Sequence, residues 1–95
     1  MKRYNSKEMA EMKEGLYLEL AQGKIDIRNA ARKMRKILGM TQKEYAKKVA
    51  GISPRILSEF ENGTGNPTIA TLDRIGSPFG LKVTFLPPVA WRNKE

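Results

Sequence analysis

Apolar residues recur at intervals of three and four along most of the chain, which is the pattern of helices that bury one face. The segment from Leu81 to Leu86 differs, because apolar and polar side chains alternate over its first five residues. This period of two predicts a β-strand. The chain is therefore expected to be an all-α domain with one C-terminal strand, and its five helices are expected at about 7–21, 27–38, 42–50, 54–61 and 69–76.

Capping residues mark the predicted helix boundaries. Thr41 and Glu44 have the spacing of a capping box, in which each side chain accepts the backbone N–H of the other residue. Ser53 followed by Pro54 predicts a second start, because proline at the first helical position lacks only an N–H that would have no partner there. Further caps are expected at Ser6, Asp26 and Thr68, stops at Gly23, Gly39, Gly51 and Asn62-Gly63, and a tight turn from Gly76 to Gly80.

Residues 41–63 thus contain two helices joined by a very short turn. The first is expected to bury Tyr45, Ala46 and Val49, and the second to bury Leu57 and Phe60. Helices joined in this way cross steeply, and in DNA-binding helix-turn-helix proteins the second helix lies in the major groove. Its outward face is expected to hold Arg55, Ile56, Ser58 and Glu59.

Positive charge is concentrated on this part of the chain. Between Lys24 and Arg55 there are ten basic and two acidic residues, a net charge of +8 that equals the formal charge of all 95 residues. A polyphosphate backbone selects such a surface, because each neutralised phosphate releases counterions. A charge run can also be a merely solvated face, but its coincidence with two closely joined helices favours nucleic-acid binding.

Several residues in this region together resemble a known family. Thr-Gln at 41–42, Glu44, Ala46, the turn glycine, Ser53 and Glu-Asn-Gly at 61–63 resemble the lambda-repressor or XRE-type helix-turn-helix. Gly-Asn-Pro-Thr at 65–68 and Gly-Leu-Lys-Val at 80–83 are similar to HipB-like antitoxins and related regulators. The resemblance covers residues 27–86 and departs from the family at one point. The spacing from Thr41 to Gly51 is one residue longer than the commonest one, so the family pattern does not define the turn.

The resemblance implies a five-helix lambda-repressor-like fold, with a helical extension at 1–24 and a helix-turn-helix DNA-binding domain at 25–80. It also implies that Gln42 anchors to a phosphate and that the loop with Thr64 and Asn66 lies near the phosphate backbone. The alternative for Thr64 and Asn66 is that their side chains only form the hydrogen bonds of an ordinary turn. Arg55 is expected to bond to a base edge, with a phosphate contact as the alternative. The expected DNA-binding residues are Thr41, Gln42, Lys43, Lys47, Ser53, Pro54, Arg55, Ile56, Ser58, Glu59, Thr64 and Asn66.

The predicted strand has no partner within the chain, and unpaired backbone groups favour pairing with another strand. The simplest partner is the same strand of a second copy, antiparallel across a two-fold axis, with Leu81, Val83 and Phe85 on the shared face. Residues 81–95 are therefore interpreted as a dimerisation strand and tail. In the tail, Trp91 is expected to cover a neighbouring apolar patch.

Composition argues against other function classes. The chain has no cysteine and no histidine, so it has no disulfide, no thiolate nucleophile and no histidine ligand for zinc. No paired carboxylates lie beside a glycine-rich loop, and neither a catalytic site, a metal site nor a cofactor is expected. The apolar runs are too short for a membrane span, and Met1-Lys2-Arg3 does not begin a signal-type segment.

The sequence thus predicts a cytoplasmic, nucleoid-associated repressor that binds double-stranded DNA as a homodimer. The resemblance implies the antitoxin or autoregulator of a toxin operon. The alternative is a toxin-neutralising interaction module with secondary DNA binding.

Overall fold

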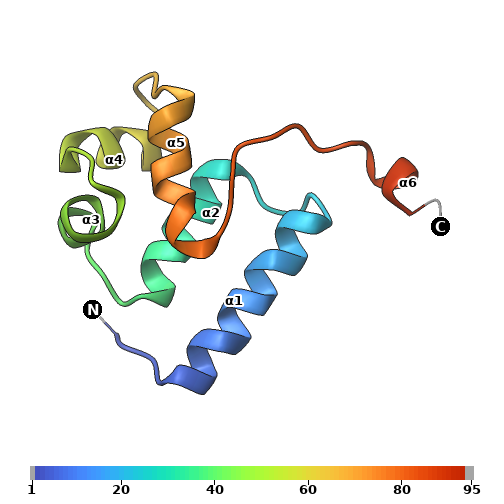
Figure 1. Cartoon of the computed structure of the whole chain (residues 1–95), viewed down its shortest axis with the longest axis horizontal. Coiled ribbons are helices and arrows are strands. Elements are labelled where there is room, and N and C mark those ends of the chain that lie inside the picture. Colours follow the sequence, from blue (N-terminus) through green and yellow to red (C-terminus); the bar gives the residue numbers. More distant parts are fainter. Residues whose placement is uncertain (1, 94–95) are drawn as a thin grey trace.

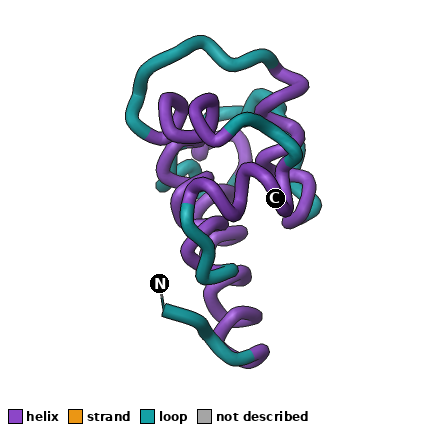
Figure 2. Tube along the Cα trace, turned by 90° about the vertical axis from the view of Figure 1, so that its left-hand side faces the viewer, coloured by secondary structure: helices purple, strands orange, loops and turns teal. Residues whose placement is uncertain are grey.

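The computed structural model describes residues 2–93, which fold into helices joined by loops (Figure 1). No residue in this range belongs to a β-strand, as Figure 2 also shows. The α-helices are α1 (Ser6–Ala21), α2 (Ile27–Ile37), α3 (Gln42–Glu44), α4 (Pro54–Glu61), α5 (Ile69–Gly76) and α6 (Val89–Arg92). A π-helix at Tyr45–Ala50 continues α3, and a 3-10 turn at Ser77–Phe79 follows α5.

Most predicted helix boundaries are confirmed, and one cap lies a residue earlier than expected. Asp26, Thr41, Ser53 and Thr68 each accept a backbone N–H at the start of their helices. At α1, however, the N-cap is Asn5 and not Ser6, because Asn5 forms a capping box with Glu8. The amide oxygen of Asn5 accepts the Glu8 N–H at 2.8 Å, and a Glu8 oxygen accepts the Asn5 N–H at 3.0 Å.

The core lies where α1, α2, the π-helix, α4 and α5 meet. Small Ala30 and Ala31 of α2 are 2% exposed, which lets neighbouring helices approach closely. The α1 helix packs on this core through Leu16, so it belongs to the same folded unit as the helix-turn-helix. The largest fully buried side chains are Tyr45, Leu16, Ile37, Leu57 and Glu61.

The first helix of the motif begins as an α-helix and changes to π geometry at Tyr45. Gly51, with φ of +66°, closes it by donating its N–H to Ala46, five residues back. This wider turn accommodates the extra residue between Thr41 and Gly51. Val49, which was predicted on the buried face, is half-buried and packs against the core, and the neighbouring Ala50 is buried.

The predicted strand at 81–86 is absent from the described residues. The segment leaves the 3-10 turn as an extended chain and passes to α6, which stands apart from the body at the opposite end from α3 and α4 (Figure 1). A ladder needs a neighbouring strand, and a single chain supplies none. The short helix α6 was not predicted. It makes a sixth α-helix within 2–93 where five were expected.

Ile27 and Ile69 fit the apolar spacing of their helices, and Trp91 was expected to cover a patch, but all three side chains are exposed. Ile27 and Ile69 are 48% and 68% exposed, because each occupies the first position of its helix, where the chain enters from solvent. Trp91 is 63% exposed, so it does not cover an apolar patch of its own chain.

Candidate nucleic-acid interface

The second helix of the motif presents its first turn to solvent. The Ser53 hydroxyl accepts the Arg55 N–H at 3.1 Å, and Pro54 occupies the first helical position. The Arg55 side chain is 85% exposed, and its Nε donates to Glu59 Oε2 at 3.3 Å across one helical turn. Ile56 is 40% exposed, while Ser58 and Glu59 are half-buried. The structure thus brings the residues predicted on this face together at one surface.

The last turn of α4 is fixed by a buried acidic residue to which the sequence analysis gave no structural role. Glu61 is 1% exposed and accepts two hydrogen bonds from Arg35 of α2, Nε to Oε2 at 3.0 Å and Nη2 to Oε1 at 2.9 Å. Gln42 Nε2 donates to the same Oε1 at 3.1 Å. A paired guanidinium and an amide together satisfy a carboxylate that would otherwise be costly to bury. Burial, followed by the charge of Glu61, also raises the pKa of the Tyr45 phenol.

Two further α2 arginines reach the backbone at the end of α4. Arg28 donates to the Phe60 carbonyl, and its guanidinium lies 4.9 Å from the centre of the Phe60 ring. Arg32 donates to the Glu61 carbonyl. The last carbonyls of a helix carry partial negative charge and have no partner within the helix, so cations stabilise them. These arginines therefore hold α4 in place.

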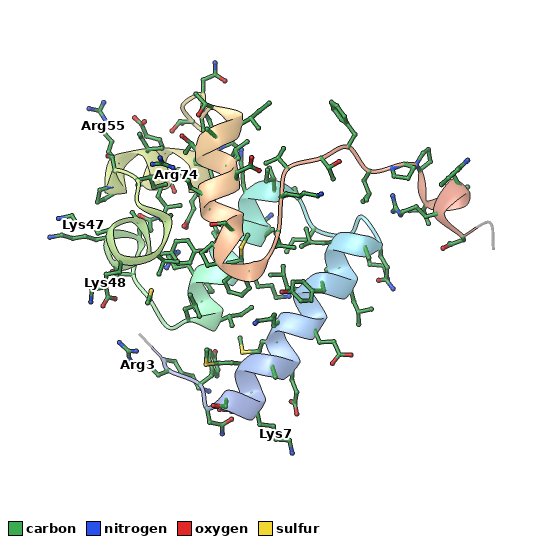
Figure 3. All side chains as sticks on the ribbon, in the orientation of Figure 1. Arg3, Lys7, Lys47, Lys48, Arg55 and Arg74 are labelled. Carbon is green, nitrogen blue, oxygen red and sulfur yellow. The ribbon has the colours of Figure 1, made fainter. Side chains whose placement is uncertain are left out.

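Four exposed cations lie on the first helix of the motif and at the start of α4. Lys43, Lys47, Lys48 and Arg55 are exposed, and Figure 3 shows Lys47, Lys48 and Arg55 projecting from the same side of the molecule. Lys48 Nζ lies 3.9 Å from Glu44 Oε2. This set of four is called the cationic face below.

Arg3 also lies on this side of the molecule, and sequence reasoning missed it (Figure 3). The chain before α1 crosses Gly39, where an added Cβ would come within 2.8 Å of the Lys2 carbonyl oxygen. Arg3 is then close enough to Glu44 to lower the pKa of its carboxyl. Only the close approach at Gly39 brings Arg3 here, and no local pattern in the sequence signals that approach.

Of the remaining predicted DNA contacts, some side chains already form hydrogen bonds within the protein and others are exposed. The Gln42 amide is occupied by Glu61, so a phosphate contact by its side chain remains a prediction that competes with this bond. The Thr64 hydroxyl donates to the Glu59 carbonyl at 3.1 Å, which is the turn chemistry weighed above. Thr41 and Asn66 are exposed.

Glu44 makes the stability of the capping box depend on pH. Hydrogen bonds from the Thr41 backbone and then its hydroxyl, helped by Lys48 and Arg3, lower the pKa of the carboxyl. Because the pKa of Glu44 is lower in the folded than in the unfolded state, the ionised carboxylate stabilises the fold fully above the ordinary glutamate pKa of about 4.3. This stabilisation is lost as the pH falls through the folded-state pKa. Glu44→Gln should therefore destabilise the protein at pH 7 and cost progressively less in acid, as measured by urea unfolding. An equal loss at every pH would show that the carboxylate charge does not matter.

A comparison with protein-family models decides the classification of this surface. The model of the helix-turn-helix family HTH_3 matches residues 32–86, more than half of the chain. The chain belongs to this helix-turn-helix family. It is of the XRE or lambda-repressor type, whose helix-turn-helix binds DNA, so α4 corresponds to the helix that enters the major groove. Searches of curated proteins and of solved structures found no match.

Other kinds of site are not seen in the described part of this helix-turn-helix protein. Within residues 2–93, no group of three or more acidic, histidine or cysteine residues could hold a metal ion. No helix in that range is long and apolar enough to cross a membrane.

In a helix-turn-helix protein, lysines beside the recognition helix are expected to contact phosphates without reading sequence. Lys43→Ala or Lys47→Ala should weaken binding to any duplex and lower the slope of log K against log salt by about one unit each. The matched control is Lys7→Ala on α1, which removes the same charge away from the cationic face (Figure 3). A slope that stays unchanged in both test variants would assign these lysines to ordinary surface.

Proposed function

We propose that the protein is a transcriptional repressor that recognises an inverted-repeat operator as a homodimer. The observation that carries this proposal is the arrangement of α4. Its last turn is fixed by Glu61 and the α2 arginines, while Arg55 and the lysines of the cationic face remain exposed at its start. A rigid helix with exposed basic side chains at its N-terminal end suits insertion into the major groove.

The homodimer is proposed to form through residues 81–86. The extended backbone there is largely without partners, and pairing with the same segment of a second copy would satisfy it. Two copies would then present their α4 helices to successive major grooves, about 34 Å apart. A single copy would lose half of the phosphate contacts and with them most of the affinity.

Selection from a pool of random duplexes tests the proposal directly. We expect the enriched sequences to be inverted repeats with half-site centres about 10 to 10.5 base pairs apart, bound by two copies, with an affinity that falls linearly with salt on logarithmic axes. Enrichment of no repeat, together with binding that is weak and insensitive to salt, would contradict it.

The similarity of residues 65–68 and 80–83 to HipB-like antitoxins supports a narrower proposal, in which the repressor regulates its own toxin operon in the nucleoid. A neighbouring reading frame that encodes no toxin-like protein would count against it. The exposed Trp91 and Phe85 favour a second candidate, a module that binds a toxin and contacts DNA only secondarily. Strong, salt-dependent DNA affinity of the isolated protein would exclude this candidate.

A further inference from the structure

The C-terminal arm, defined as residues 81–92, carries large apolar side chains that its own chain leaves exposed. Phe85 is 98% exposed, Trp91 63%, and Leu86 and Val89 50% each. Single exposed apolar residues are normal in soluble proteins, whereas a group of this size marks an interaction site.

An apolar groove of about 390 Å³ lies between this arm and the helices. The end of α1, together with α2 and α5, forms one side, and residues 81–84 and 86 of the arm form the other. Phe85 is the one residue of 81–86 that does not border the groove. A space of this size is within the range of pockets that hold a small ligand, so it can accept one aromatic side chain. The walls that the argument uses are Leu20, Ile27, Met34, Leu72, Val83 and Leu86.

The arm that carries Phe85 is anchored to the body of the domain by two hydrogen bonds from its backbone. The Val83 N–H donates to Asp73 Oδ1 at 3.0 Å, and the Leu81 N–H donates to the Gly76 carbonyl at 3.1 Å. Leu81 also packs so closely on Gly76 that an added Cβ there would lie 3.2 Å from the Leu81 Cβ. With the arm anchored at Leu81 and Val83, Leu86 borders the groove and Phe85 does not.

We propose that Phe85 of each copy occupies the groove of a second copy. This inference rests on the homodimer of the proposed function and specifies what its interface contains. Every chain has one arm and one groove, so in two copies related by a two-fold axis each arm fills the groove of the other copy. No arm or groove is then left for a third copy. Antiparallel pairing of the arms carries each Phe85 past the partner's arm toward the partner's groove.

The area at stake is large enough for a stable dimer. Burying Phe85 and the exposed part of Trp91 would remove on the order of 300 Å² from water per copy, since aromatic side chains bury about 150–250 Å² each. Counting both copies and the surfaces that they cover gives on the order of 1,200 Å², the lower bound for a specific interface.

The test uses one variant on each side of the contact. Phe85→Lys changes the arm, and Ile27→Glu changes the groove at a side chain that is 48% exposed, where an acid suits the helix start. Val83→Pro is a poorer choice, because it would remove the backbone N–H that Asp73 accepts. The matched control for Ile27 is Leu18→Glu, which places the same charge at a 54% exposed leucine outside the groove. Far-UV circular dichroism and thermal unfolding check that each variant is folded.

Sedimentation of the DNA-free protein should show a dimer for the wild type and for Leu18→Glu. The dimer dissociation constant of Phe85→Lys and of Ile27→Glu should each rise on the order of 100-fold, the loss expected for a central interface residue. An equal mixture of the two variants, and a chain carrying both changes, should regain the dimer, because the introduced lysine of one copy then faces the introduced glutamate of the other.

Other outcomes overturn the inference. If Ile27→Glu stays dimeric while Phe85→Lys does not, the arms pair without entering the groove. If both variants stay dimeric, the interface lies elsewhere. If the wild type is monomeric, the arm binds a different protein. A separate measurement tests the proposed function. Retardation of a duplex by the wild-type protein reports DNA binding whether or not Phe85 fills the groove.

Discussion

Replacing Glu61 with alanine should lower the free energy of unfolding by about 3 to 5 kcal/mol, the cost of removing one partner from a buried ion pair. The Arg35 guanidinium, 13% exposed, would lose the carboxylate that accepts two of its hydrogen bonds, and the Gln42 amide would lose its acceptor. Urea unfolding followed by circular dichroism measures the loss.

The control for this prediction is Glu59→Ala, two residues earlier on the same helix. Glu59 pairs with a largely exposed arginine, and such pairs contribute under about 1 kcal/mol. A double variant, Arg35→Met with Glu61→Leu, should be more stable than Glu61→Ala, because it leaves no charge buried alone. Equal losses for Glu59→Ala and Glu61→Ala would show that the buried pair does not hold α4.

Replacing Arg55 with alanine should weaken operator binding by about 1 to 3 kcal/mol and relax the base preference at one position of each half-site. The arginine projects from the first turn of α4, where side chains reach base edges, and its fork geometry suits guanine O6 and N7. Affinities for duplexes that carry each of the four bases at that position measure the effect.

Lys47→Ala provides the contrast for Arg55, because loss of a phosphate contact weakens binding to all four duplexes equally. If Arg55→Ala behaves in the same way, Arg55 contacts a phosphate and another residue reads the base. The same measurement applies to Glu59, since its carboxylate pairs with Arg55 and would have to release it on DNA.

Local signals in the sequence were enough to predict most helix boundaries. Thr41 with Glu44, and Ser53 with Pro54, determine helix starts through bonds within four residues, so no tertiary contact is needed to find them. The α1 cap was misplaced because Asn5 and Ser6 are both good capping residues, and the position of Glu8 decides between them.

Tertiary contacts account for what the sequence did not reveal. Arg28, Arg32 and Arg35 follow the spacing of an exposed helical face, yet all three turn toward the end of α4. Glu61 could have been found, because it lies four residues after Leu57 and therefore on the buried side. Arg3 could not, since only the crossing at Gly39 brings it to the cationic face. The arm at 81–86 was assigned as a strand from alternation alone, and alternation does not supply the neighbour that a strand requires.

The π-helix has a consequence for how this motif can change in length during evolution. Gain or loss of one codon inside an α-helix rotates everything beyond it by about 100°, which would turn a recognition helix away from its groove. Here the surplus residue is taken up between Tyr45 and Ala50, and the Thr41 cap and the Gly51 turn both keep their roles. An in-frame deletion in that stretch would remove a bulge and leave the helix continuous. Descendants of different length can therefore keep the same base-contacting residues.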